Sequence, residues 1–210
     1  MTDLRPLWEL RLLTPRLELR LPTGDELVEL FQVAAAGVHP PDEMPFAIAW
    51  TDNLREDAFL EYHRSAWASW HPDRWRCAFV TFLQGRPIGS QGIEAENFAA
   101  TRTVNTGSWL GAAHQGHGFG TEQRAAVLEF AFRGLEAEAA VSGALFHNIP
   151  SQRISDKLGY RRTGTSTVSP RGEPVEHYDY RLDRSDWTCP IPVALEAVEP
   201  ARSLFDAASP

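Results

Sequence analysis

A short run with three alternating glycines, Gln115-Gly116-His117-Gly118-Phe119-Gly120-Thr121, is the part of this chain best suited to chemistry. Glycine has no Cβ, so the backbone can curl until successive N–H groups point at one spot. A helix that begins there adds the partial positive charge of its N-terminus. The run therefore predicts a turn that binds an anion, and a diphosphate is the expected ligand.

The residues on either side of this run predict the elements that must position it. Upstream, residues 103–110 have the β-branched and aromatic content of a strand. Downstream, Thr121 to Phe132 reads as a helix capped by Thr121 or a glycine and stopped by Gly134. Two familiar phosphate motifs fit poorly. A Walker loop needs a lysine where the run ends, and a dinucleotide fingerprint would follow the first strand of the domain.

A second segment, residues 148–160, combines polar and helical signals. It follows an apolar stretch, residues 139–146, that predicts a strand. Pro150 and Ser151 suit the first turn of a short helix, its apolar face carries Ile154 and Leu158, and Gly159 ends it.

Together the two segments resemble the GNAT superfamily of acyl-CoA-dependent N-acetyltransferases, in its RimJ/RimL-like branch, which acetylates protein N-termini and related amines. Gln115-x-x-Gly118-x-Gly120 is similar to the pyrophosphate loop of that superfamily. Asn148-x-x-Ser151 with Lys157-Leu158-Gly159-Tyr160 is similar to its second cofactor-contacting helix and the strand that follows. The resemblance extends over roughly residues 12–187, and the order and spacing of the two motifs are more specific than either motif alone.

The resemblance implies a fold and a cofactor. The GNAT fold is a mixed α/β fold: a central, mostly antiparallel sheet that splays beside the glycine loop, with helices on both faces. Acetyl-CoA would be the acyl donor, with its pantetheine arm in the gap. Backbone groups of Trp109, Leu110 and Gly111 would bind the arm, and Asn148 and Ser151 would face it further in. The pyrophosphate would be held by backbone N–H groups of Gln115, Gly116, His117, Gly118, Phe119, Gly120 and Thr121.

Three side chains are the catalytic candidates. Glu94 is the expected proton acceptor, directly or through water, although a solvated loop carboxylate explains it equally well. Ser108 could hydrogen-bond the amine. Many superfamily members carry a tyrosine seven residues after the motif asparagine, and this chain has Ser155 there. By resemblance to the RimJ/RimL-like branch, Ser151 would then donate a proton to the departing sulfur, unless it only caps the helix.

Further candidates are weaker. Glu176, His177 and Asp179 lie on a predicted strand near the C-terminus, and His177 has a suitable intrinsic pKa. The cluster Trp67, Trp70 and Trp75 could line an acceptor pocket, but core packing is the better expectation.

The rest of the chain completes a single domain over residues 1–187, with residues 188–210 expected to be a tail. A proline-rich loop spans 39–46. Strands are expected at 12–21, 75–83, 86–93, 160–167 and 175–182, and helices at 25–36 and 53–70. Strands followed by a strand–loop–helix unit, another strand and helix, and a hairpin predict a mixed sheet covered on both faces.

Composition narrows the partners. A net charge of −8 argues against nucleic acid and mildly favours a cationic amine. No apolar run approaches the roughly 18 residues of a membrane span, and the N-terminus does not resemble a signal peptide, so the expected location is cytoplasmic. Neither Cys77 and Cys189 nor His114 and His117 have the spacing of metal ligands, so no metal is expected.

The sequence therefore predicts an N-acetyltransferase that moves an acetyl group directly from acetyl-CoA to a primary amine through a ternary complex. The acceptor would be a protein N-terminus or a lysine. An amine of pKa about 7.7–8.0, as at a chain N-terminus, needs less help from a base than a lysine at about 10.4. A small-molecule or antibiotic acetyltransferase and a non-catalytic acyl-CoA-binding module stay open as alternatives. The chain could act as a monomer or a homodimer.

Overall fold

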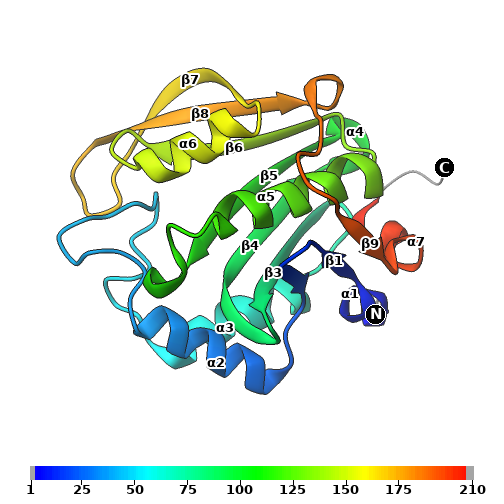
Figure 1. The fold of residues 1–210 in the computed structure, drawn as a ribbon, viewed down its shortest axis with the longest axis horizontal. Coiled ribbons are helices and arrows are strands. Elements are labelled where there is room, and N and C mark those ends of the chain that lie inside the picture. Colours follow the sequence, from blue (N-terminus) through cyan, green and yellow to red (C-terminus); the bar gives the residue numbers. More distant parts are fainter. Residues whose placement is uncertain (1–2, 207–210) are drawn as a thin grey trace.

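The computed structural model describes residues 3–206, and its centre is one mixed sheet of nine strands (Figure 1). Neighbouring strands follow the order β7-β8-β6-β5-β4-β3-β2-β1-β9. All neighbours pair antiparallel except β5 and β6, which run parallel. The strands are β1 (Arg11–Leu13), β2 (Leu17–Arg20), β3 (Arg74–Leu83), β4 (Arg86–Glu96), β5 (Thr103–Leu110), β6 (Ala139–Leu145), β7 (Arg161–Val168), β8 (Val175–Asp183) and β9 (Ala194–Glu196). The mixed, mostly antiparallel sheet that we expected is confirmed.

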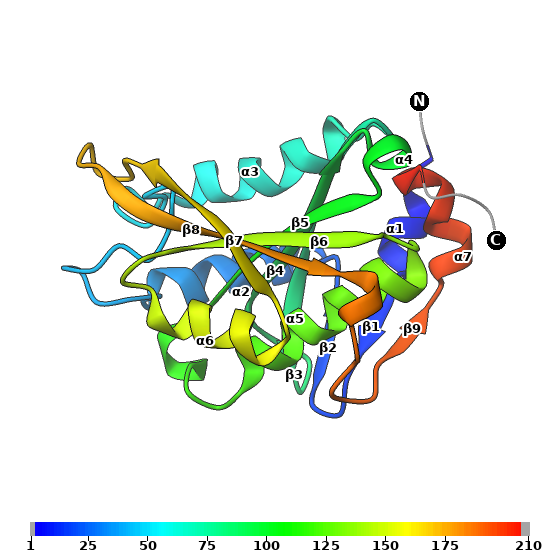
Figure 2. The same cartoon turned by 90° about the horizontal axis from the view of Figure 1, so that it is seen from above.

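Helices cover both faces of this sheet. Figure 2 shows α3 (Glu56–Ala68) on one side and α5 (Phe119–Glu129) and α6 (Ile149–Lys157) on the other. One apolar cluster joins α3 and α2 (Gly24–Ala35) to side chains of β3 such as Val80 and Phe82. A larger cluster joins α5 to the opposite face of β3, where Cys77 and Phe79 point. The three short helices are α1 (Arg5–Glu9), α4 (Phe98–Thr101) and α7 (Val198–Ala201).

The sheet opens between β5 and β6. The two strands pair only from Thr103 to Asn105, opposite Ala139 to Val141. Beyond that point β5 continues along β4 as far as Leu110, whereas β6 continues along β8 as far as Leu145. The strands visibly diverge in Figure 1. The predicted splay is therefore confirmed, and it lies beside the glycine run.

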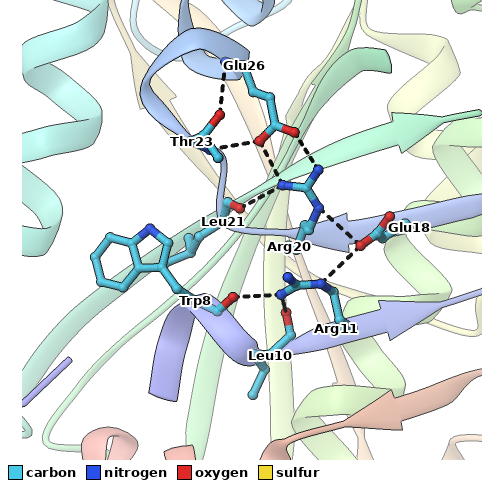
Figure 3. Close-up of polar contacts among 8 residues, drawn as sticks. All are labelled: Trp8, Leu10, Arg11, Glu18, Arg20, Leu21, Thr23 and Glu26. Atoms are coloured by element: carbon cyan, nitrogen blue, oxygen red, sulfur yellow. Dashed lines mark hydrogen bonds and ion pairs between the residues drawn. The ribbon is translucent and has the colours of Figure 1, made fainter. Parts of the chain in front are cut away.

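A polar network fixes α2 against β1 and β2 (Figure 3). Thr23 and Glu26 form a capping box, in which the Thr23 side chain accepts from Glu26 N–H and Glu26 accepts from Thr23 N–H at 2.7 Å. Arg20 donates to both oxygens of Glu26, and this pairing lowers the pKa of Glu26 to about 2. Glu18 then bridges Arg20 and Arg11, each at 3.0 Å. The network sets the direction of α2. Val38, which lies just after this helix, accepts from the side chain of Gln115 at the start of the glycine run.

One of the predicted strands differs from the structure. The single strand expected at 12–21 is a hairpin, because the turn after Leu13 returns the chain through a Thr14 N–H bond to Leu17 O of 2.9 Å. The strands expected at 75–83 and 86–93 are present as β3 and β4. The tight turn between them has positive φ at both residues, 51° at Gln84 and 77° at Gly85.

The expectation of a C-terminal tail is wrong for residues 188–206. β9 pairs with β1, and Leu204 and Phe205 are buried among core aromatics. Trp70 and Trp75 donate their indole N–H groups to the carbonyls of Leu204 and Phe205, at 2.8 and 3.1 Å. The segment closes the core through contacts with distant residues, which leave no periodic signal in the sequence. Residues 207–210 lie outside the described residues.

Candidate active site

The glycine run forms a tight turn that leads into α5. Gly116 and Gly118 have φ values of 79° and 82°, a conformation that favours glycine, and α5 begins at Phe119 without a side-chain cap. Within residues 3–206, no partner exists for the backbone N–H groups of residues 116–121. Six consecutive free donors at a helix N-terminus have the character that binding of an anion such as a diphosphate requires.

Gly111 and Gln115, upstream of this turn, hold it in place through hydrogen bonds to neighbouring segments. The Gln115 side chain donates to Val38 O at 2.7 Å and to Leu110 O at 2.9 Å, which ties the turn to the end of α2 and to β5. The Gln115 N–H bonds Ala112 O, and the Gly111 N–H bonds Ile88 O on β4. These two N–H groups are therefore already hydrogen-bonded within the chain. Of the N–H groups expected to hold a pyrophosphate, those of residues 116–121 are still free.

A buried carboxylate holds the turn from the other side. Glu122, in the first turn of α5, accepts from Thr14 Oγ1 at 2.6 Å and from Arg16 Nε at 2.7 Å. Arg16 also donates to His117 O at 3.1 Å, and its guanidinium lies 4.5 Å from the centre of the Phe119 ring. The pair anchors the N-terminus of α5 to the β1–β2 turn. Sequence reasoning missed Arg16, because nothing in its local pattern points to residue 122.

The opening between β5 and β6 holds a cavity of about 540 Å³ that we call the donor cavity. Its wall includes the glycine turn, the outer parts of β5 and β6, and the first turns of α6. Asn148 caps α6 by accepting from Ser151 N–H at 3.1 Å, and its amide group donates to Pro45 O at 3.0 Å. Ser151 is thus not the helix cap. Its hydroxyl has no hydrogen-bond partner among the described residues, and it lines the donor cavity.

A second cavity of about 650 Å³, the acceptor cavity, lies on the α3 side of β4 and β5. Gly92 and Gly107 stand opposite each other on its floor, and Glu94 and Asn105 are the next pair on the same face of the strands. Aromatic rings form the walls: Phe46, Trp50, Phe59, Tyr62 and Trp109. Phe46, Gly107, Ser108 and Trp109 line both cavities.

The structure separates the three catalytic candidates. Glu94 is half-buried within β4, not in a loop after it, and its Oε1 accepts from Asn105 Nδ2 at 2.9 Å. Glu94 faces the acceptor cavity, and Ser151 lies in the donor cavity. Ser108 lies on the strand between them, and its Oγ accepts from Arg124 at 3.2 Å. Alternation along β5 directs Ser108 to the face opposite Glu94.

Of the weaker candidates, only His177 lines the donor cavity. Its ring packs over Gly143 so closely that a Cβ there would lie 2.1 Å from Cε1. Its Nδ1 lies 3.1 Å from Asp179 Oδ1, and Glu176 pairs with Arg162 on the exposed side.

Sequence reasoning missed most of the acceptor cavity. Of the predicted tryptophan cluster, Trp70 and Trp75 belong to the core, and Trp67 packs edge-on against Trp8. The cavity wall instead includes His63, which is 2% exposed and has no partner for its Nδ1 within residues 3–206. Burial, with Arg76 nearby, lowers the pKa of His63 to about 4, so this histidine is neutral near pH 7.

The loop between α2 and α3 crosses over both cavities. Its residues Met44 and Pro45 accept from His147 and Asn148, at 2.8 and 3.0 Å. Arg171, at the tip of the β7–β8 hairpin, holds Asp52 in the same loop through two bonds of 2.7 and 2.8 Å. The loop, with Phe46 on its inner side, therefore connects the two halves of the splayed sheet.

A sequence profile described as the acetyltransferase (GNAT) domain matches residues 16–161, well over half of the chain. The chain belongs to the GNAT acetyltransferase family, in agreement with the glycine turn, the splay and α6.

Individual relatives are distant. The probable N-acetyltransferase YjcK of Bacillus subtilis is 27% identical over 44% of this chain and 51% of its own length. The chain spans about half the length of the curated relatives it matches. Among solved structures, RimJ of Mycobacterium smegmatis in complex with CoA-disulfide has a TM-score of 0.71 at 17% identity, covering 94% of this chain and 95% of that one. The RimL acetyltransferase of ribosomal L7/L12 in complex with coenzyme A has a TM-score of 0.65 at 14% identity, covering 81% and 95%.

Over residues 3–206, no helix is long and apolar enough to cross a membrane. The same residues contain no group of three or more His, Cys, Asp or Glu side chains that could hold a metal ion. Cys77 and Cys189 are both free thiols.

Proposed function

We propose that this chain transfers an acetyl group from acetyl-CoA directly to a primary amine within a ternary complex. The observation that carries the proposal is the pair of cavities on opposite faces of β5, which share residues 107–109. Two separate cavities that meet at one strand can hold donor and acceptor at the same time. Their junction is where the thioester and the amine would meet.

On the donor side, the pyrophosphate of acetyl-CoA would lie on the free N–H groups of residues 116–121. The pantetheine arm would extend along the open edge of β5 near Trp109 and Leu110, facing Ser151 across the opening. Arg153 lines the same cavity, is exposed and has no ion-pair partner within residues 3–206. It is a fitting counter-charge for the remaining phosphate of the cofactor.

On the acceptor side, Glu94 would accept the proton of the attacking amine, with Asn105 holding its carboxylate. The thioester is already activated, so the protein must mainly supply position, a base, and donors for the carbonyl oxygen and the sulfur. Ser151, free of any capping role, would protonate the departing sulfur.

The shape of the acceptor side supports a polypeptide acceptor. A surface groove of about 720 Å³ shares Arg76, Glu94 and Asn105 with the acceptor cavity. A chain N-terminus could enter the cavity with the following residues in this groove. The aromatic walls support the second candidate, a small amine with an apolar body, because such a ligand needs only the cavity itself.

The test supplies the purified protein with acetyl-CoA and one acceptor at a time: peptides with a free N-terminus, N-terminally blocked peptides with one lysine, polyamines and drug amines. Release of free CoA and a mass gain of one acetyl group on the acceptor would support the proposal. Cofactor binding without release for any acceptor would instead indicate a non-catalytic acyl-CoA-binding module.

Two variants test the assigned roles. Gly118→Trp should block the anion cradle, and unchanged acetyl-CoA affinity would refute that assignment. Glu94→Gln should lower kcat about 10²–10⁴-fold while the acetyl-CoA affinity stays the same, as expected for loss of a general base. A wild-type rate in Glu94→Gln would exclude Glu94 as the proton acceptor.

A further inference from the structure

Arg124, in the second turn of α5, is a buried cation without a counter-ion. It is 3% exposed and lines the donor cavity. No carboxylate pairs with it among residues 3–206, and its Nε has no hydrogen-bond partner there. A buried charge is costly unless it is paired, so an unpaired one at a ligand cavity points to a function.

The guanidinium is surrounded by three serine hydroxyls from three elements. Its Nη2 donates to Ser108 Oγ on β5 at 3.2 Å. Its Nη1 donates to Ser142 Oγ on β6 and to Ser155 Oγ on α6, each at 3.4 Å. A guanidinium has donors and no acceptor, so each of these oxygens must receive a hydrogen from it and direct its own hydrogen elsewhere.

The hydrogens of the three serines have different destinations. Ser142 donates to Thr106 O at 2.9 Å, and Ser155 donates to Ser151 O at 3.2 Å. Within residues 3–206, the Ser108 hydroxyl has no acceptor. Ser108 is also the only one of the three that lines both the donor and the acceptor cavity. Arg124 therefore leaves one hydroxyl with an uncommitted hydrogen, on the residue that borders both cavities.

We propose that Ser108 donates a hydrogen bond to the thioester carbonyl oxygen and that Arg124 is the positioning residue that turns and strengthens this donor. The inference rests on the proposed acetyl transfer. When the amine attacks, the C–N bond forms and the electron pair of the C=O bond moves to oxygen. Ser108 stabilises that negative oxygen without giving up its proton, and the pair returns when the C–S bond breaks.

Physical chemistry favours this arrangement. A hydroxyl that accepts from a cation becomes a better donor, and the effect is larger in a site that excludes water. A donor fixed before the reaction needs no reorganisation when charge develops, which is the basis of oxyanion stabilisation. The cation also lies on the side of Ser108 away from the amine, so it attracts the developing negative charge without repelling the attacking nitrogen through direct contact.

The first measurement is independent of any acceptor. Infrared difference spectra of carbonyl-¹³C acetyl-CoA bound to the protein report hydrogen bonding to the thioester oxygen as a lower C=O frequency. We expect a lowered frequency in the wild-type protein, a frequency near that of free acetyl-CoA in Ser108→Ala, and an intermediate one in Arg124→Met. The wild-type frequency retained in Ser108→Ala would overturn the proposal and would leave the proposed acetyl transfer intact.

The second measurement uses the wild-type reaction with its best acceptor. Ser108→Ala should lower kcat about 10²–10³-fold and change the Kd of acetyl-CoA less than twofold, as for loss of one oxyanion donor. Arg124→Met should lower kcat by a similar factor, and the double variant should be no slower than Ser108→Ala alone. Independent effects that multiply in the double variant would show that Arg124 does not act through Ser108.

Ser142→Ala is the matched control, because Ser142 receives a hydrogen bond from the same guanidinium but has its own hydrogen committed to Thr106. Its kcat and infrared spectrum should match the wild type. If Arg124→Met fails to fold, the comparison of Ser108→Ala with Ser142→Ala still tests the proposal. An equal decrease in kcat in these two variants would overturn it. If no acceptor is ever found, the infrared result alone supports or refutes it.

Discussion

Replacing Gly107 by alanine should raise the stability of the protein and slow acetyl transfer at the same time. Gly107 lies on the floor of the acceptor cavity, and a Cβ built on it meets no heavy atom within 4 Å. Its φ is not in the left-handed region, so alanine fits the strand without strain. Alternation with Asn105 and Trp109 directs the new methyl group to the acceptor side.

The two effects have different magnitudes. Gly→Ala at a compatible position stabilises by about 0.4–1 kcal/mol, mainly by restricting the unfolded chain. For a chain of this length that raises Tm by roughly 1–4 °C. One methyl group in a fitted pocket costs about 1–3 kcal/mol of transition-state binding, so kcat/KM for the acceptor should fall about 10-fold or more.

The assay combines calorimetry with CoA-release kinetics at several acceptor concentrations, and isothermal titration gives the Kd of acetyl-CoA, which should stay within about twofold. Gly107→Val should enlarge the kinetic loss. Gly89→Ala is the contrasting control, because its Cβ would lie 2.3 Å from Trp109 O and should destabilise the protein outright. A Gly107→Ala protein that is more stable and as fast as the wild type would refute the location of the acceptor.

Three further predictions concern burial and charge. Burial lowers the pKa of His63 from 6.5 to about 4, so the folded protein takes up a proton on this ring less readily than the unfolded chain does. The free energy of unfolding should therefore fall by about 3 kcal/mol as the pH drops from 6.5 to 4. In His63→Phe, urea denaturation at a series of pH values should show a weaker dependence of stability on pH. Arg171→Ala should speed hydrogen exchange in residues 39–52 and leave the free energy of unfolding nearly unchanged, because the pair with Asp52 lies at the surface. Arg16→Ala should cost about 1–2 kcal/mol in urea denaturation by leaving Glu122 short of its cation, and Glu122→Gln in the same protein should restore part of that loss.

The glycine turn and the strand and helix beside it could be predicted from the sequence because their signals are local. Positive φ at Gly116 and Gly118, the helix that follows and the strand at residues 103–110 all arise within one short stretch of chain. The cap of α6 is equally local, although from the sequence we considered only Ser151 for it, and the structure has Asn148. Short-range sterics and hydrogen bonds determine these features, so residue type and spacing carry them.

The acceptor half could not be predicted, because its walls come from segments far apart in the chain. Trp50 packs on Trp109 at a ring-centroid distance of 5.4 Å, although one residue precedes α3 and the other lies on β5. The role of Arg124 could not be predicted from the sequence for a different reason. It lies on the buried side of α5, where a charged residue contradicts the apolar pattern, and only the structure shows three hydroxyls around it. Such conflicts between pattern and burial are expected where function overrides stability.

The register between β4 and β5 decides whether the site can work, since one strand carries groups for both substrates. Ser108 points to Arg124, whereas Gly107 and Trp109 line the acceptor side, and a slip by one residue would exchange the two faces. A polar contact between the two strands supports this register, because Gln91 Nε2 donates to Gly107 O at 3.1 Å. On its other edge β4 is held to β3, where Ser90 Oγ donates to Phe79 O at 2.9 Å. The close approach of Gly89 to Trp109 O allows no side chain at that position in the paired strand. The residues that set the register are thus as necessary to the proposed chemistry as those that would touch the substrates.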